Sequence, residues 1–153
     1  MSHSLSFAQL CQQIVTEARD AIVFADREGF IRLWNRGAEE IFGHSADMAL
    51  GQPLDFIIPE SLRERHNQGY RRAMATGKTK YTRELLAVPG LRRGQERISL
   101  EFTLTLIKDV QGRVLGAAAI IREVTSRWQQ EREREKRLTE LEARLAKLCS
   151  PKD

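Results

Sequence analysis

Residues 34–43 read Trp-Asn-Arg-Gly-Ala-Glu-Glu-Ile-Phe-Gly, and this stretch has the pattern of a strand that leads directly into a short helix. Asn35 is a favoured N-cap residue, because its side-chain oxygen can accept a hydrogen bond from a free amide of the first helical turn. Glu39, four residues further on, can support that turn. Gly43 suits the left-handed conformation that ends many helices. We therefore predict a short helix over 36–42 that directly follows a strand.

The residues before this stretch predict a helix and a β-hairpin. Residues 5–18 place apolar side chains at helical spacing, which indicates an amphipathic helix. Residues 20–26 (DAIVFAD) are a short apolar run typical of a strand, and Gly29 after three charged residues is a turn signal. Residues 30–34 then form the second strand.

The residues after it predict further helices and three strands. We expect a short turn at 45–48 capped by Ser45, and a loop over 51–58 with at most one helical turn. Pro59 suits the first position of a helix, here about 60–75, that ends at Gly77. Three segments that resemble strands follow, at 80–88, 97–107 and 113–123.

The last part of the chain has the composition of a coiled coil. From Ser126 there is no Gly or Pro before Pro151, and leucines stand at 138, 141, 145 and 148, the 3-4-3 spacing of a and d positions. One heptad earlier these positions hold Glu131 and Arg134, so the apolar seam is short. We expect a homodimer through this helix, joined by the helix at 5–18. A helix folded back on its own domain is the alternative.

Three segments together resemble the PAS family. Residues 20–31 match its first hairpin, residues 34–43 its next helix, and Arg122-Glu123-Val124-Thr125 stands where the family has Asp-Ile-Thr before the exit helix. The resemblance implies an α+β fold, with a five-stranded antiparallel sheet and helices on one face. It implies a PAS domain over 19–125, a flanking helix in 1–18 and a signalling helix in 126–153. PAS domains are sensors and interaction modules.

The segment 63–77 resembles the long helix of FixL-type haem PAS sensors. That resemblance implies that His66 is the axial ligand, and so the metal-binding residue, of a b-type haem. It implies that Arg72 holds a haem propionate, and it adds Tyr70 to the cofactor-binding residues. A neutral imidazole on a rigid helix, facing an apolar cavity, is what a five-coordinate haem requires.

The following strands bear on what such a haem would sense. The resemblance places Phe102 and Leu104 over the gas-binding side. Leu86 stands where the oxygen sensors have an arginine that hydrogen-bonds bound oxygen, and Arg83 is the nearest alternative. We therefore expect CO, NO or a redox change as the signal rather than oxygen.

Other occupants of the cavity stay open. Light-sensing relatives carry a cysteine in the segment that here reads IIPESL at 57–62, so its absence excludes that photochemistry. A non-covalent FAD or FMN remains an alternative, with Asn67 and Gln68 as candidates. The cavity can also be empty or hold a small metabolite, and the domain would then be a dimerisation or protein-interaction module.

Composition excludes several other classes of function. The net charge of +4 is small and the charges are interleaved, so nucleic-acid binding is not expected. No membrane span or signal peptide is visible, and Cys11 and Cys149 form neither a metal motif nor a disulfide framework, so a cytoplasmic location is expected. The sequence contains no G-x-S-x-G, P-loop or H-E-x-x-H motif, so we do not expect an enzyme. The signal is expected to pass to a separate downstream signalling protein, and His3 and His44 are weaker ligand candidates than His66.

Overall fold

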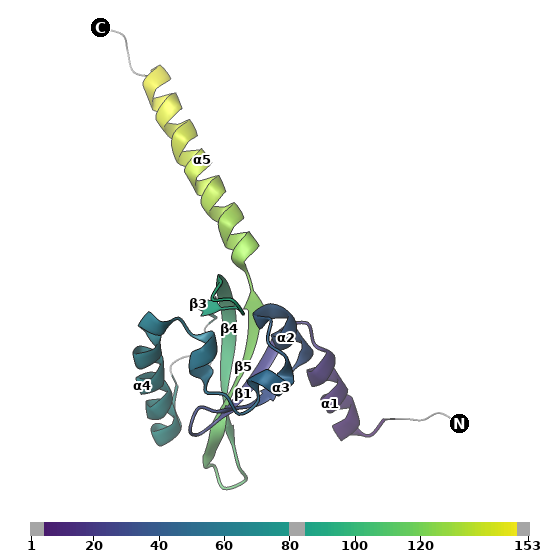
Figure 1. Ribbon diagram of the computed structural model, residues 1–153. Helices are drawn as coiled ribbons and strands as arrows, with labels where there is room; N and C mark the ends of the chain where they lie inside the picture. Colours follow the sequence, from purple (N-terminus) through teal and green to yellow (C-terminus); the bar gives the residue numbers. More distant parts are fainter. Residues whose placement is uncertain (1–4, 80–84, 150–153) are drawn as a thin grey trace. The chain divides into compact units, whose positions relative to one another are not determined.

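The computed structural model describes residues 5–79 and 85–149, and it contains the antiparallel sheet that the sequence predicts (Figure 1). Its strands lie in the order β2-β1-β5-β4-β3. The strands are β1 (Ala21–Asp26), β2 (Ile31–Trp34), β3 (Leu86–Leu91), β4 (Arg97–Lys108) and β5 (Val114–Glu123). The chain divides into two compact units, residues 1–123 and 124–153.

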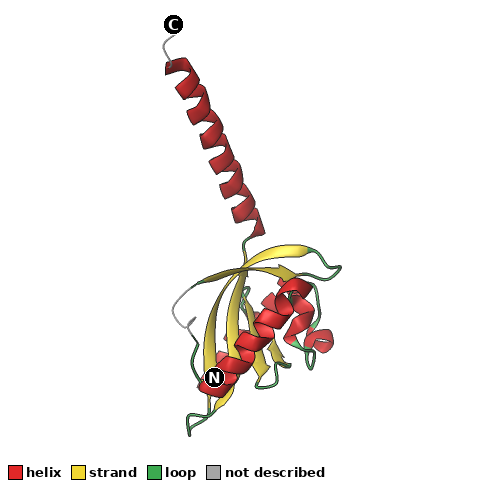
Figure 2. Ribbon diagram, turned by 90° about the vertical axis from the view of Figure 1, so that its left-hand side faces the viewer, coloured by secondary structure: helices red, strands yellow, loops and turns green. Residues whose placement is uncertain are grey.

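The first unit also contains the predicted helices. These are α1 (Phe7–Glu17), α2 (Arg36–Phe42), α3 (Ala46–Ala49), the 3₁₀ helix η1 (Leu54–Ile57) and α4 (Glu60–Thr76). Figure 2 shows α4 in front of the strands. In the second unit, α5 (Thr125–Cys149) is a single helix. Within the described residues, no helix is both long and apolar enough to cross a membrane.

The helices α2, α3, η1 and α4 cover one face of the sheet. Directly opposite residues on paired strands share a face, so Val23, Ala119 and Leu104 lie on one side. This side packs against Phe42, which is fully buried. The rings of Trp34 and Phe42 lie 5.2 Å apart between centroids in the same cluster. Together these residues form the core that the alternating strand pattern requires.

The stretch 34–43 folds as predicted. Asn35 Oδ1 accepts a hydrogen bond from the amide of Ala38 at 3.0 Å, and Gly43 ends α2 with φ of 72°. Ser45 is the N-cap residue of α3, as predicted, but its hydroxyl makes no capping hydrogen bond. Glu39 takes that role instead: its Oε1 accepts from the amide of Ala46 at 2.6 Å. A carboxylate from the preceding helix therefore satisfies the first free amide of α3.

The strand predicted over 80–88 differs from β3, which runs from Leu86 to Leu91. Residues 80–84 lie outside the described residues. At the other end, the predicted strand stopped at Val88, before Pro89, a residue that lacks an amide hydrogen. Since β3 is an edge strand, a proline there can leave its missing donor on the unpaired side. The strand therefore continues through Pro89 and Gly90, opposite Ser99 and Ile98 of β4.

The flanking helices leave apolar side chains exposed. Ser6 and Gln9 form a capping box that starts α1. Phe7, Leu10 and Ile14 of α1 are exposed, Phe7 by 82%. The four leucines of the α5 seam, Leu138, Leu141, Leu145 and Leu148, are exposed as well. The structure describes one copy of the chain, so the pairing of these helices stays a prediction.

Candidate functional site

The inner face of α4 carries the residue that the sequence proposed as an iron ligand. His66, Tyr70 and Met74 follow one another at intervals of four residues, so they share one side of the helix. Met74 is buried, whereas His66 and Tyr70 are half-buried. The rings of His66 and Tyr70 lie 5.9 Å apart. The helix phase therefore turns His66 inward, toward the side that packs on the sheet.

Tyr70 ties α4 to the first strand of the sheet. Its hydroxyl lies 2.6 Å from the carbonyl oxygen of Asp26 and 2.9 Å from that of Ala25, both of which can accept its hydrogen. Burial raises the pKa of Tyr70 to about 12. The phenol therefore stays protonated at neutral pH, as a donor to the backbone of β1 rather than as an acid or base.

A hydrogen-bond chain connects His66 to the 3₁₀ helix η1. Asn67 Nδ2 donates to Asp55 Oδ1 at 3.0 Å and lies 3.3 Å from Asp55 Oδ2. Asn67 Oδ1 lies 3.2 Å from His66 Nδ1. All three side chains are half-buried. Sequence reasoning missed Asp55, which lies twelve residues before Asn67 in a segment expected to be a loop.

Some of the other predicted site residues lie near this face. Tyr70 and Leu104 pack in one cluster with Met74. Phe102 packs against the main core, and Leu86 of β3 lies directly opposite Phe102 of β4. The structure thus brings Tyr70 and Leu104 into one cluster, and Leu86 and Phe102 into one strand pair.

Arg72 lies elsewhere. It is exposed, and six residues of α-helix turn it about 120° away from His66. Arg83, the other cation considered, lies outside the described residues.

The flavin candidates and the other histidines differ in their surroundings. Gln68 is exposed and donates to Glu64 Oε1 at 2.7 Å, while Asn67 faces Asp55. The ring of His44 lies tilted against that of Phe56, with centroids 4.8 Å apart. Burial of His44 and the charge of Arg93 lower the pKa of His44. His3 lies outside the described residues.

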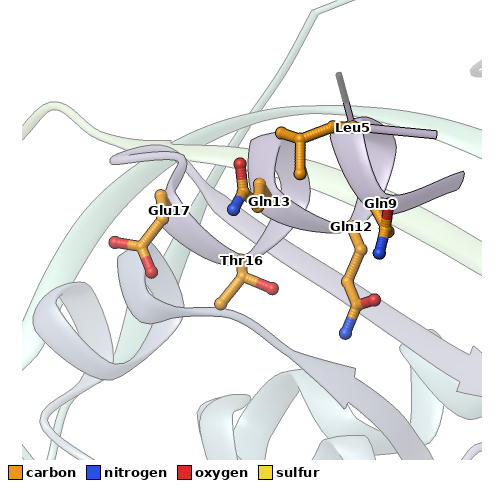
Figure 3. Close-up of a pocket in the computed structure, with 6 residues that line it drawn as sticks. All are labelled: Leu5, Gln9, Gln12, Gln13, Thr16 and Glu17. Atoms are coloured by element: carbon orange, nitrogen blue, oxygen red, sulfur yellow. The ribbon is translucent and has the colours of Figure 1, made fainter. Parts of the chain in front are cut away.

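Two surface hollows lie away from His66. One, of about 330 Å³, is lined by Leu5, Gln9, Gln12, Gln13, Thr16 and Glu17. Figure 3 shows that apart from Leu5 these side chains come from α1, so this is a groove along one helix. The other, of about 500 Å³, is lined by Pro59, Glu60, Ser61, Leu91, Gln95 and Arg97. In the described ranges, no three His, Cys, Asp or Glu side chains form a metal-binding group.

Comparison with protein families and known proteins gives a consistent picture. A family model described as the PAS fold matches residues 15–129. An uncharacterized protein of Azorhizobium caulinodans is 33% identical over 116 residues, covering 67% of this chain and 16% of that protein. The Sensor protein FixL of Bradyrhizobium diazoefficiens is 37% identical over 57 residues, covering 37% of this chain and 11% of FixL.

A third relative is the signal transduction histidine-protein kinase AtoS of Escherichia coli, 28% identical over 137 residues, covering 88% of this chain and 20% of AtoS. This chain therefore spans a fifth or less of the length of these relatives.

Solved structures agree on the fold. A PAS domain from Colwellia psychrerythraea superposes with a TM-score of 0.69 at 23% identity, covering 79% of this chain and 99% of that one. An RNA-binding Light-Oxygen-Voltage receptor superposes with a TM-score of 0.71 at 21% identity, covering 91% of this chain and 40% of that one. At these identities the likeness concerns the fold alone.

Proposed function

We propose that this chain, which belongs to the PAS family, senses a signal within its PAS fold and transmits it through helix α5, without catalysing a reaction itself. PAS sensing in signal transduction is the role that the relatives FixL and AtoS support. The observation that carries the proposal is the position of β5. This strand pairs with β1 on one side and β4 on the other, and it ends one residue before α5 begins.

The connection between β5 and α5 explains how a signal could leave the domain. A central strand cannot shift without its two neighbours, so a change on the inner face of the sheet reaches β5. Val124 alone separates the end of β5 from Thr125, the first residue of α5. A coupling of about 1–3 kcal/mol between the two parts is enough to change a helix pairing several-fold. Because the leucine seam is short, such a weak pairing is easily retuned.

For the input, we propose a b-type haem held by His66. When bound, haem supplies an iron that takes up a diatomic gas or changes its oxidation state. His66 fits the role of axial ligand, because it lies on the inner face of α4 and its Nδ1 faces an acceptor, which leaves Nε2 for a metal. Leu86, Phe102 and Leu104 would provide apolar surroundings on β3 and β4. With Leu86 in place of a hydrogen-bond donor, CO, NO or a redox change remains the favoured signal.

Arg72 does not fit the role of propionate partner in this structure, because it lies on another side of α4. A haem at His66 would therefore need a different cation, or would leave its propionates in water. The lack of a propionate partner lowers the expected affinity for haem, but it does not change the role of His66 as iron ligand. Gln68 is exposed as well, so of the two side chains considered for a flavin only Asn67 remains a candidate.

A second candidate function is a cofactor-free dimerisation module. The exposed leucines of α5 and the exposed Phe7, Leu10 and Ile14 of α1 favour it, since such apolar rows gain stability by pairing. Homodimerisation through α5 and α1 is common to both candidates. The downstream signalling protein would then recognise the dimer, and the cytoplasm is the expected compartment.

Absorbance spectroscopy separates the two candidates. The chain is produced in haem-supplemented cells, and we expect a Soret band that His66→Ala abolishes. His44→Ala is the matched control, because His44 is also half-buried yet lies outside α4, and its band should equal that of the wild type. A colourless wild-type protein that still forms dimers would overturn the haem proposal in favour of the second candidate. A flavin spectrum would point to FAD or FMN.

A further inference from the structure

We infer that Asp55 and Asn67 are positioning residues that fix the tautomer of His66, with the hydrogen on Nδ1 and the lone pair on Nε2. The inference deepens the proposed function, because an imidazole binds a metal only through a nitrogen that carries no hydrogen. It names two residues for which the sequence resemblance gave no such role.

Asp55 sets the orientation of the Asn67 amide. An ionised carboxylate accepts hydrogen bonds and donates none. The group of Asn67 that lies 3.0 and 3.3 Å from the two Asp55 oxygens must therefore be the NH₂ group. The reversed amide would place its oxygen against the carboxylate, where two acceptors repel. Asp55 thus decides which end of the amide faces His66.

The Asn67 amide in turn sets the tautomer of the His66 imidazole. With its NH₂ group on Asp55, Asn67 presents its Oδ1 to His66 Nδ1 at 3.2 Å. An amide oxygen only accepts, so Nδ1 must donate. A neutral imidazole carries one hydrogen, which leaves Nε2 with the lone pair. Among the described residues, no hydrogen bond reaches Nε2, so this lone pair is available for a ligand.

The chain of bonds also orients the ring. Asp55 lies in η1, and Asn67 and His66 lie in α4, so the three side chains are held by regular elements rather than by a free loop. The negative charge of Asp55 polarises the amide and strengthens the next bond. We expect the bond from His66 to Asn67 to favour the Nδ1–H tautomer by about tenfold. A purely structural tie between η1 and α4 would stabilise the domain without this preference.

The tautomer is measured directly by long-range ¹H–¹⁵N NMR on the cofactor-free full chain, at pH about 8.5, where histidines are generally neutral. The spectrum of His66→Ala assigns the resonances. We expect a protonated Nδ1 and an unprotonated Nε2 for His66 in the wild type. Asn67→Leu should shift the population toward Nε2–H. A wild-type His66 that is mainly Nε2–H, or an unchanged ratio in Asn67→Leu, would overturn the inference.

The matched control exchanges the two partners. In the double variant Asp55→Asn with Asn67→Asp, the amide at 55 donates to the carboxylate at 67, whose other oxygen accepts from His66 Nδ1. This variant should keep the wild-type tautomer. If Asn67→Leu fails to fold, Asn67→Ser replaces it, since serine is small and also lacks the amide oxygen at this position.

Titration with haem tests the link to the proposed function separately. Loss of such an outer partner typically weakens metal binding by about 10–100-fold, so Asn67→Leu should bind haem less tightly by that factor, and the exchanged variant should not. A measurable haem affinity that is equal in all three proteins would overturn the link between the tautomer of His66 and haem binding. A wild type that binds no haem but shows the expected tautomer would refute the haem proposal alone and leave the positioning of His66 standing.

Discussion

The side-chain nitrogen of Asn35 donates a hydrogen bond to the backbone oxygen of Asp20 over 3.0 Å. The same nitrogen lies 2.9 Å from the carbonyl oxygen of Val15 and 3.2 Å from that of Ala18. On its other side, Asn35 Oδ1 accepts from the amide of Ile22 at 2.8 Å, besides capping α2. One buried amide therefore joins the end of α1, the start of β1 and the start of α2.

This position predicts that Asn35→Asp is strongly destabilising. Aspartate keeps an oxygen for the two amides but turns a second oxygen toward the backbone carbonyls of residues 15, 18 and 20. Asn35 is only 5% exposed, so the new charge would be buried among acceptors. We expect a loss of about 3–5 kcal/mol in the free energy of unfolding, measured by urea denaturation. Ser6→Ala, which removes only the cap of exposed α1, should cost about 1 kcal/mol. Equal losses in the two variants would contradict this account.

Gly37, next to the cap, lies against the chain before β1. A Cβ atom there would clash with the backbone carbonyl oxygens of Asp20 and Arg19. Because both oxygens are backbone atoms, the clash can be relieved only if α2 moves. We expect Gly37→Ala to lower the free energy of unfolding by about 2–3 kcal/mol.

Gly69 is the matched control for this substitution. It lies in α4, is exposed, and a Cβ atom there would meet nothing within 4 Å. Gly69→Ala should therefore raise stability by about 0.5–1 kcal/mol through helix propensity. A stabilising Gly37→Ala would show that the close approach of α2 to residues 19 and 20 is wrong.

An ion pair across the sheet predicts a pH dependence. Arg122 on β5 donates to both carboxylate oxygens of Asp20, at 3.1 and 2.6 Å, and this hydrogen bonding lowers the pKa of Asp20 despite the opposing effect of burial. A lowered pKa in the folded state gives stability that is present above the unfolded value of about 3.9. That stability is lost as the pH falls through the folded value.

Urea denaturation of Arg122→Gln and the wild type tests this pair. The variant should be the less stable protein at pH 7, and the difference should vanish at a pH below the folded pKa of Asp20. Arg71→Gln is the control, because Arg71 lies 3.9 Å from its exposed partner Glu64, too far for a strong pair. A difference between Arg122→Gln and the wild type that stays constant down to low pH would exclude Asp20 as its cause.

The sequence predicted the elements better than the contacts between them. The cap by Asn35 follows from local preference, since a residue of this type before a short apolar helix has few other roles. Its bonds to the carbonyl oxygens of residues 15, 18 and 20 depend on how α1 and β1 lie against α2, and no local pattern encodes that. The predicted strand stopped at Val88, whereas β3 continues through Pro89, and the place of β3 at the sheet edge is a property of the whole topology.

The candidate site, too, could be predicted from the sequence only in part. The spacing of His66, Tyr70 and Met74 already indicates one helix face, so the inward direction of His66 could be predicted. The same helical phase could have shown that Arg72, six residues on, faces elsewhere. Asp55 could not have been found, because its approach to Asn67 depends on how η1 packs against α4.

The leucine seam of α5 predicts how the chain pairs. Leu141 and Leu145 occupy adjacent d and a positions and are exposed in the single chain. Because burying a leucine contributes about 1.5–3 kcal/mol and a symmetric pair loses two of them, Leu145→Lys should weaken the dimer more than tenfold in sedimentation equilibrium. Ala143→Lys places the same charge at an outer position two residues earlier, in the preceding heptad, and should leave the dimer constant unchanged. If both variants dimerise like the wild type, α5 is not the dimer contact, and the exposed apolar residues of α1 become the next surface to test.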